Sequence, residues 1–510
     1  MDIIILKSFL PEFFLSISIL FQLIYNIKIV NNFKYNFPII DKEIFYQTLF
    51  ILISLLFLYS NLKIEGFFSN FLFINDESTR IMKIFTLLTC SLMLHALLQA
   101  FSLQRLNFFE FFVIFLLSIF SLLLLISASD LISFYLVIEM QSLCFYILAS
   151  FKRDSSFSTE AGLKYFISGA FISGIFLFGS SLLYGCLGSL NFNVLNLLLS
   201  SQLPWNLTQE YYAFLFVGVL CVIVTLLFKL ACAPFHFWAP DVYEGSPLSS
   251  TMVFSIVPKI AIVYFLLKFI FSINELFSDF EEILIFCGAL SITLGTFYAL
   301  AQKRFKKLII YSSISQIGFI IIGLATNNFN GYVAVMFFLV IYIITSILIW
   351  SHIALFYNFQ QKINTFYNKL STSLFISSLT NFFQTNKLWS FSFLIVFFSI
   401  GGIPPLTGFL SKILILFEVI NNKQIYMAAV LLIISSISVF YYIRVIKVMF
   451  FEPKNVEKSY EKFQVIFHNV FLDNIYMIFI ILLLVLLIAF FYPTMPLLSC
   501  QYIILNLWSL

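Results

Sequence analysis

Long apolar stretches, separated by short polar or charged ones, follow one another along the whole chain. A membrane-spanning helix needs about 20 mostly apolar residues, and about fourteen windows approach or exceed that length. These windows cover roughly residues 7–27, 47–63, 84–101, 108–127, 131–151, 163–188, 212–238, 248–271, 283–302, 306–325, 331–357, 391–421, 425–450 and 473–493. They are too long and too uniformly apolar for barrel strands. The pattern therefore predicts an all-α fold, a polytopic transmembrane helical bundle of about 14 helices.

The composition agrees with this interpretation. Of the 510 residues, 61% are hydrophobic and only 10% are charged, and 69 are Phe. A water-soluble protein could not cover that much apolar surface with polar groups. The net charge of +4 is small for so long a chain, and no nucleic-acid partner is expected.

The basic residues are unevenly distributed between the loops. Most of the 28 Lys and Arg residues follow odd-numbered windows. The few in the remaining loops include Arg80, Lys83 and Lys268. Because basic loops stay on the side of the membrane where synthesis occurs, both termini are predicted on the basic-poor side. The run KRFKK at 303–307 is expected to contact anionic phospholipid headgroups.

Three lysines fall well inside apolar windows, namely Lys229, Lys259 and Lys412, and Glu139 lies in the middle of the fifth window. Each buried lysine costs roughly 2.5–3.5 kcal/mol on insertion scales. A buried lysine can exchange its proton when a neighbouring charge changes, whereas arginine cannot. Because the amines in the middle of these windows are lysines and not arginines, a proton relay is favoured. The alternative is a set of satisfied ion pairs or packing anchors.

Two windows contain helix-breaking residues next to a buried lysine. Pro234 follows Lys229 by five positions in the seventh window. The residues that precede Lys412 in the twelfth window are Gly401, Gly402, Pro404 and Pro405. Unwound backbone at membrane depth persists where it lines a wet cavity or is buried in protein. A simple packing kink is the alternative at either site.

The breaks lie five windows apart, which predicts two inverted five-helix repeats made of windows 4–8 and 9–13. The predicted organisation has four parts. They are residues 1–107, a three-helix segment; 108–271, the first repeat; 283–450, the second repeat; and 451–510, a C-terminal helix and tail.

Further titratable residues are weaker candidates. His236, next to Pro234, and Glu418, late in the twelfth window, are possible relay groups; a packed imidazole and a headgroup contact are the alternatives. Glu12 is expected to reach the membrane surface. The seven Cys form no Cys-x-x-Cys pair, so no metal or iron–sulfur site is expected.

Several stretches carry a family resemblance. They are EMQSLCFYILASFKRDSSFSTEAGLKYFISGAF (139–171), APFHFWAPDVYEGSP (233–247), VPKI (257–260), KRFKKLIIYSSISQIG (303–318) and GGIPPLTGFLSK (401–412). With these, the chain resembles the subunit 2 family of NADH:ubiquinone oxidoreductase (respiratory complex I), of the mitochondrial type.

The resemblance implies an antiporter-like membrane-arm subunit that moves protons while other subunits carry the redox chemistry. Glu139 matches the family's fifth-helix glutamate and Lys259 its eighth-helix lysine, while Lys229 and Lys412 match the lysines of its broken helices. It implies no cofactor on this chain, with NADH, FMN, iron–sulfur clusters and ubiquinone on other subunits. The partners would be other membrane-arm subunits, including antiporter-like neighbours. The location would be the mitochondrial inner membrane, with both termini on the intermembrane-space side and the basic loops in the matrix.

Three other functions remain open at this point. A stand-alone cation/proton antiporter would use the same helices and lysines. A plastid-type homologue would be coupled to plastoquinone. A purely structural spacer would leave the buried lysines unexplained.

Overall fold

The computed structural model describes residues 7–32, 39–60, 66–68, 72–104, 109–202, 209–367, 375–380, 383, 387–452 and 473–508. Almost all of these residues are helical. The chain divides into two compact units. The first contains residues 1–231, 235–282 and 502–510, and the second contains residues 232–234 and 283–501.

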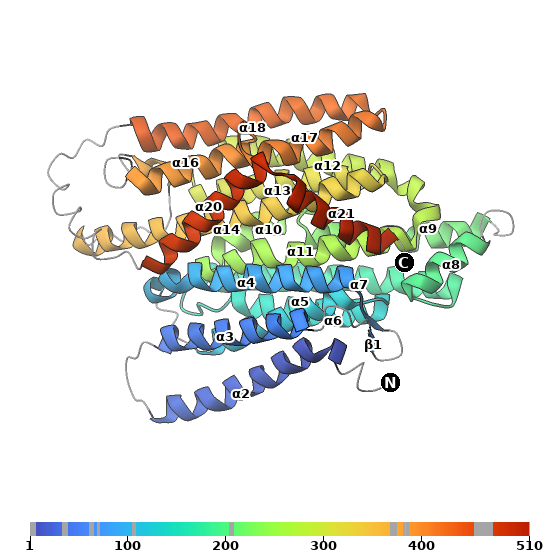
Figure 1. The fold of residues 1–510 in the computed structure, drawn as a ribbon, viewed down its shortest axis with the longest axis horizontal. Helices are drawn as coiled ribbons and strands as arrows, with labels where there is room; N and C mark the ends of the chain where they lie inside the picture. Colours follow the sequence, from blue (N-terminus) through green and yellow to red (C-terminus); the bar gives the residue numbers. More distant parts are fainter. Residues whose placement is uncertain are drawn as a thin grey trace. The chain divides into compact units, whose positions relative to one another are not determined.

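The first unit holds most of the N-terminal half of the chain (Figure 1). Its elements are α2 (Leu10–Asn32), α3 (Ile39–Ser60), β1 (Gly66–Phe68), β2 (Phe73–Asn75), α4 (Glu77–Gln104), α5 (Phe109–Ser127), α6 (Leu131–Ala149), α7 (Ser156–Leu187), α8 (Phe192–Gln202), α9 (Gln209–Lys229), α10 (Trp238–Gly245) and α11 (Leu248–Ser272). Within it, α11 packs against α4, α5, α6, α8 and α9, and nearly every side chain of α11 is buried. This helix is therefore the centre of the unit.

The second unit is built around α14, which packs against α13, α16, α17 and α20. Its elements are α13 (Phe305–Leu324), α14 (Phe329–Tyr367), the 3-10 helix η1 (Ile376–Leu379), α16 (Lys387–Gly401), α17 (Thr407–Asn421), α18 (Ile425–Phe451) and α20 (Asp473–Phe491). Two further helices contribute residues to both units, α12 (Asn274–Ala301) and α21 (Thr494–Trp508). In Figure 1 the orange helices α17 and α18 run side by side, as their mutual contacts require.

Among the described residues, eleven helices are long and apolar enough to cross a membrane. The number rises to twelve if α20 and α21, which meet at an angle of 85°, form one broken span. The seventh and twelfth windows are both interrupted by non-helical backbone, as the sequence predicts: α9 is separated from α10, and α16 from α17. The chain is thus a polytopic helical membrane protein.

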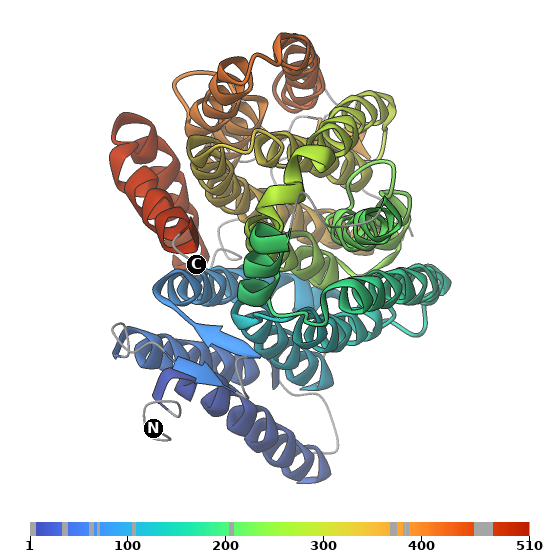
Figure 2. The ribbon, with the colours of Figure 1, turned by 90° about the vertical axis from the view of Figure 1, so that its right-hand side faces the viewer.

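One short sheet accompanies the helices of this all-α fold. Strands β1 and β2 form a short antiparallel hairpin, which Figure 2 shows as two blue arrows. The residue before β2, Leu72, accepts hydrogen bonds from the Ser129 amide (3.1 Å) and the Ser133 hydroxyl (3.0 Å). The hairpin therefore ties its loop to the junction between α5 and α6.

Asp130 lies in that junction and caps α6. Its carboxylate accepts a hydrogen bond from the Ile132 amide (2.8 Å), which satisfies one of the free donors at the helix start. Burial raises the pKa of Asp130 above its ordinary value, and the Ile132 hydrogen bond partly offsets this effect. Asp130 thus fixes where α6 begins.

The assignment of Arg80, Lys83 and Lys268 to loops is wrong. Arg80 and Lys83 lie within α4 and Lys268 within α11, and all three are buried. Arg80 is therefore a buried arginine in the first turn of α4 and not a loop residue. Glu12 does not reach the membrane surface either, because it is buried and paired with Lys83 at 2.5 Å. An opposite charge inside the protein removes the reason for either group to reach water.

Candidate functional site

Glu139 and Lys229 belong to the first unit and interact with each other. Glu139 lies on α6, where its Oε2 accepts a hydrogen bond from the Ser142 hydroxyl (3.3 Å). Its Oε1 is buried and has no hydrogen-bond partner. Lys229 is the last residue of α9, and the Glu139 carboxylate acts on it electrostatically. A carboxylate with an unsatisfied oxygen near an amine at a helix break is suited to proton exchange.

The break after Lys229 runs from residue 230 to residue 237 and contains Pro234. It begins with Ala231, whose φ of 59° is left-handed and cannot continue a helix. The carbonyl of Phe228 accepts two hydrogen bonds, one from the Ala231 amide (2.9 Å) and one from Trp238 Nε1 (3.1 Å). A backbone amide and a side chain thus both bind this carbonyl near the end of α9, as a polar group away from water requires.

His236 lies inside this break and is buried. Its ring stacks on that of Phe237, with the centroids 4.7 Å apart. It therefore shares the break with Lys229, although it is packed against an aromatic ring.

Lys259 is buried in the middle of α11, directly after Pro258. A proline has no amide hydrogen for the carbonyl four residues earlier, which here is that of Phe254. The Tyr243 hydroxyl donates to that carbonyl instead (3.4 Å). The helix stays continuous, and Lys259 remains at mid-helix.

Lys412, in the second unit, binds directly to the broken end of α16. Its Nζ donates to the carbonyls of Ile400 (2.8 Å) and Gly401 (2.9 Å), which end the helix. Gly402 follows with a φ of 82°, a conformation that favours glycine. The unpaired carbonyls and the negative end of the helix dipole both attract the ammonium group.

A cavity of about 40 Å³ lies beside Lys412. Its polar lining residues include Ser312, Gln316, Thr345 and Ser411. A polar cavity of this size has room for water and offers it several hydrogen-bond partners. Lys412 therefore lies where it can exchange a proton with water.

The structure does not bring Glu418 into an ion pair with Lys412. Glu418 is half-buried, and it accepts a hydrogen bond from Asn421 Nδ2 (3.5 Å) on the next turn of α17. The Lys412 ammonium group instead donates to the backbone carbonyls of Ile400 and Gly401. The lysine is held by the broken helix rather than by this acid.

Gly408 allows α17 to approach α16 at the break. A Cβ at this position would collide with the backbone carbonyl of Ser399. We expect Gly408→Ala to lower stability by about 1–3 kcal/mol, because the two helices must separate. The measurement is the midpoint of thermal unfolding of the detergent-solubilised protein. The matched control is Gly174→Ala, since nothing lies within 4 Å of a Cβ there; equal midpoints for both variants would contradict the expectation.

Sequence reasoning missed Lys268 as a buried charge. It lies four residues from the end of α11 and donates to the Ile126 carbonyl (2.7 Å). A signal was present, because position 268 falls inside the eighth apolar window.

In the part of the chain that the structure describes, no group of three or more His, Cys, Asp or Glu side chains could hold a metal ion.

The fold and the buried charges define a polytopic helical membrane protein with titratable groups in its interior. Residues 128–440 match the model of the NADH:quinone oxidoreductase/Mrp antiporter transmembrane family, and the chain belongs to this family. Among its relatives is NADH-ubiquinone oxidoreductase chain 2 of Marchantia polymorpha, 38% identical over 87% of this chain and 88% of the relative. Another is NADH-quinone oxidoreductase subunit N of Pelagibacter ubique, 34% identical over 92% and 93%.

Solved structures share the fold at lower sequence identity. A chain of respiratory complex I from Thermus thermophilus has a TM-score of 0.74 and 24% identity, covering 96% of this chain and 98% of that one. A chain of the Mrp complex from Dietzia has a TM-score of 0.81 and 17% identity, covering 99% and 98%. The fold is therefore common to redox-coupled complexes and to an Mrp complex, whereas the relatives above 30% identity named here are oxidoreductase subunits.

Proposed function

We propose that this chain is a proton-translocating membrane subunit of NADH:ubiquinone oxidoreductase. The observation that carries the proposal is the geometry of Lys412. A buried lysine binds the carbonyls of a broken helix beside a polar cavity. The family membership supports the coupling to NADH oxidation on other subunits.

In the proposed mechanism, Glu139 and Lys259 form the coupling pair on the inner side. Lys229, on which the Glu139 carboxylate acts electrostatically, relays the proton toward Lys412. A change of charge at one group shifts the protonation of the next through Coulomb forces, which are stronger in an interior of low dielectric constant. Lysine suits each relay position because, unlike arginine, it can release its proton. His236 and Glu418 are secondary relay candidates.

We place the chain in the mitochondrial inner membrane, with its basic loops in the matrix and both termini toward the intermembrane space. The excess of basic residues after odd-numbered windows supports this orientation. We further propose about fourteen transmembrane segments, of which segments 4–8 and 9–13 form two inverted repeats. The positions of the two helix breaks support the repeats.

On this proposal the chain carries no redox centre, and NADH, FMN, iron–sulfur clusters and ubiquinone are bound by other subunits. Its partners are other membrane-arm subunits, including antiporter-like neighbours, together with phospholipids. The exposed basic residues Lys303 and Arg304, between α12 and α13, are suited to contact anionic headgroups.

A native gel of mild-detergent extracts tests the proposal. We expect the chain to migrate in a very large assembly that oxidises NADH in the gel. Peptide identification from that band should return flavin- and iron–sulfur-bearing subunits. A small homo-oligomer without NADH oxidation would contradict the proposal.

That contrary result would favour the second candidate, a stand-alone cation/proton antiporter. The likeness of the fold to a chain of an Mrp complex supports this candidate. The plastid alternative would instead place the chain in an assembly that reduces plastoquinone, which the same gel distinguishes by its co-migrating subunits.

A further inference from the structure

Lys268 in the first unit has the same kind of surroundings as Lys412 in the second unit. Each ammonium group donates to carbonyls at the C-terminal end of a neighbouring helix. Lys268 binds the carbonyl of Ile126 (2.7 Å), in the last turn of α5, and that of Ala128 (3.4 Å), just after α5. Each side chain is buried, with 7% of Lys268 and 8% of Lys412 exposed. Each also lies over an aromatic ring, 5.0 Å from the centroid of Tyr264 in the case of Lys268.

A cavity of about 40 Å³ lies next to Lys268, and a cavity of the same size lies next to Lys412. Its polar lining comes from Asp76, Ser129, Asn193 and Asn196. Asn193 is exposed, so the cavity lies at the surface of the unit. Water in this space would have the hydroxyl, amide and carboxylate partners that it needs.

Asp76 is the acid beside this cavity. It is half-buried at the start of α4. The charged groups that act electrostatically on Lys268 are Asp76 and Lys83, of opposite sign to one another. Asp76 can therefore accept a proton near the ammonium group, while Lys83 disfavours a second positive charge.

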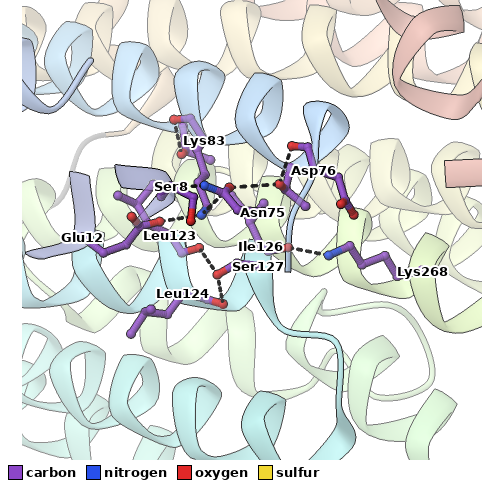
Figure 3. A network of polar contacts seen from close by, with 12 residues as sticks. Ser8, Glu12, Asn75, Asp76, Lys83, Leu123, Leu124, Ile126, Ser127 and Lys268 are labelled. Atoms are coloured by element: carbon purple, nitrogen blue, oxygen red, sulfur yellow. Dashed lines mark hydrogen bonds and ion pairs between the residues drawn. The ribbon is translucent and has the colours of Figure 1, made fainter. Parts of the chain in front are cut away.

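Figure 3 shows the buried polar network that continues from this place. Asn75, next to Asp76 in the chain, accepts a hydrogen bond from Lys83 Nζ (3.0 Å) and donates to the carbonyl of Ser8. Lys83 in turn pairs with Glu12 at 2.5 Å. This network fixes the turn that carries Asp76, because its members come from α2, the β-hairpin and α4.

The cavity lies at the end of the unit opposite the basic loop after α6. Ser129 precedes the first residue of α6, whereas Lys152 and Arg153 follow its last. With 19 residues, α6 spans about 28 Å, close to the hydrocarbon thickness of a bilayer. In the proposed orientation the cavity therefore faces the side to which protons are released.

We infer that Lys268, with Asp76 and the cavity between them, is a proton-release site of the first unit. The inference rests on the proposed function. Nine positions, or about 13 Å of helix, separate Lys259 from Lys268 along α11. Between them comes Tyr264, whose hydroxyl is hydrogen-bonded to that of Ser78 (2.9 Å).

The step moves one proton. The N–H bond of the Lys268 ammonium breaks, and the proton passes to a water molecule in the cavity and then to the Asp76 carboxylate or to bulk water. Neutral Lys268 then regains a proton from the interior. An arginine would make the same hydrogen bonds to the α5 carbonyls but would not release its proton.

The test uses the complete complex in sealed vesicles, with proton translocation measured per NADH oxidised. We expect Lys268→Arg and Asp76→Asn to lower this ratio several-fold while the complex assembles normally. Lys268→Met should do the same. If it fails to assemble, the arginine variant still gives the answer. Lys423→Met, at an exposed lysine after α17, is the matched control.

Full proton translocation by Lys268→Arg would overturn the inference, because it would show that Lys268 only anchors the end of α5. Lys412→Met separates this failure from a failure of the proposed function. If Lys412→Met abolishes translocation while Lys268→Arg does not, only the inference fails. If neither variant affects translocation, the proposed function fails as well.

Discussion

Replacing Lys412 by methionine should lower proton translocation by about tenfold or more, because a group that transfers protons typically contributes about 10²–10⁴-fold in rate. Methionine has a similar length and no proton to exchange. The carbonyls of Ile400 and Gly401 would lose the lysine's hydrogen bonds. Gln316 Nε2 still donates to the Ile400 carbonyl (3.5 Å), and the adjacent cavity can admit water. We therefore expect the complex to assemble. Lys229→Met should act in the same direction.

The measurement is the initial rate of acidification by sealed vesicles, compared with NADH oxidation in the presence of an uncoupler. Lys423→Met is the control, since Lys423 is exposed just beyond the same helix. Lys412→Arg adds a second comparison, because it keeps the charge and removes proton release. Unchanged translocation in both Lys412→Met and Lys229→Met would favour the structural spacer over the proton relay.

Replacing Lys83 by methionine should destabilise the protein by about 3–5 kcal/mol, because Glu12 would be left as an unpaired buried charge. The pair is almost completely enclosed, with 0% of the Lys83 side chain and 4% of the Glu12 side chain exposed. Asn75 would also lose the ammonium group that it binds. The measurement is the thermal midpoint of the solubilised complex together with its amount on native gels.

The matched control is an exposed ion pair, Lys447–Glu452, at 3.9 Å and with 67% and 44% of the side chains exposed. Lys447→Met should cost no more than about 1 kcal/mol. A double variant, Lys83→Met with Glu12→Leu, should recover much of the lost stability, because replacing both partners by apolar groups leaves no unpaired charge. A double variant less stable than Lys83→Met would contradict this account.

The helix breaks show which structural features the local sequence can predict and which it cannot. Proline removes a backbone hydrogen bond and glycine permits left-handed backbone wherever they occur. The interruptions around Pro234 and at Gly402 therefore follow from the local sequence. How the freed groups are satisfied does not follow. Trp238 binds the Phe228 carbonyl and Tyr243 that of Phe254, and neither contact has a sequence signal of its own.

The charged residues also fall into two groups: those whose burial the sequence predicts, and those whose burial only the structure shows. Lys412 is far from both ends of its window, so an extended side chain could not reach the membrane surface, and its burial is evident from its position alone. Lys268 and Lys83 lie near window ends, where a lysine ordinarily reaches the membrane surface. Sequence reasoning therefore placed both in loops, together with Arg80, and the structure buries all three.

What the sequence by itself determined is that the chain crosses a membrane many times as helices, and that amines are retained inside them. Hydropathy and backbone chemistry act locally, so they can be read along the chain. What only the tertiary structure decided is the set of partners. Lys268 meets a carbonyl 142 positions away, and Lys83 meets a carboxylate 71 positions away. Such pairings depend on which helix faces pack together. Hydropathy does not determine this, because many sequences with the same hydropathy pattern would pack differently.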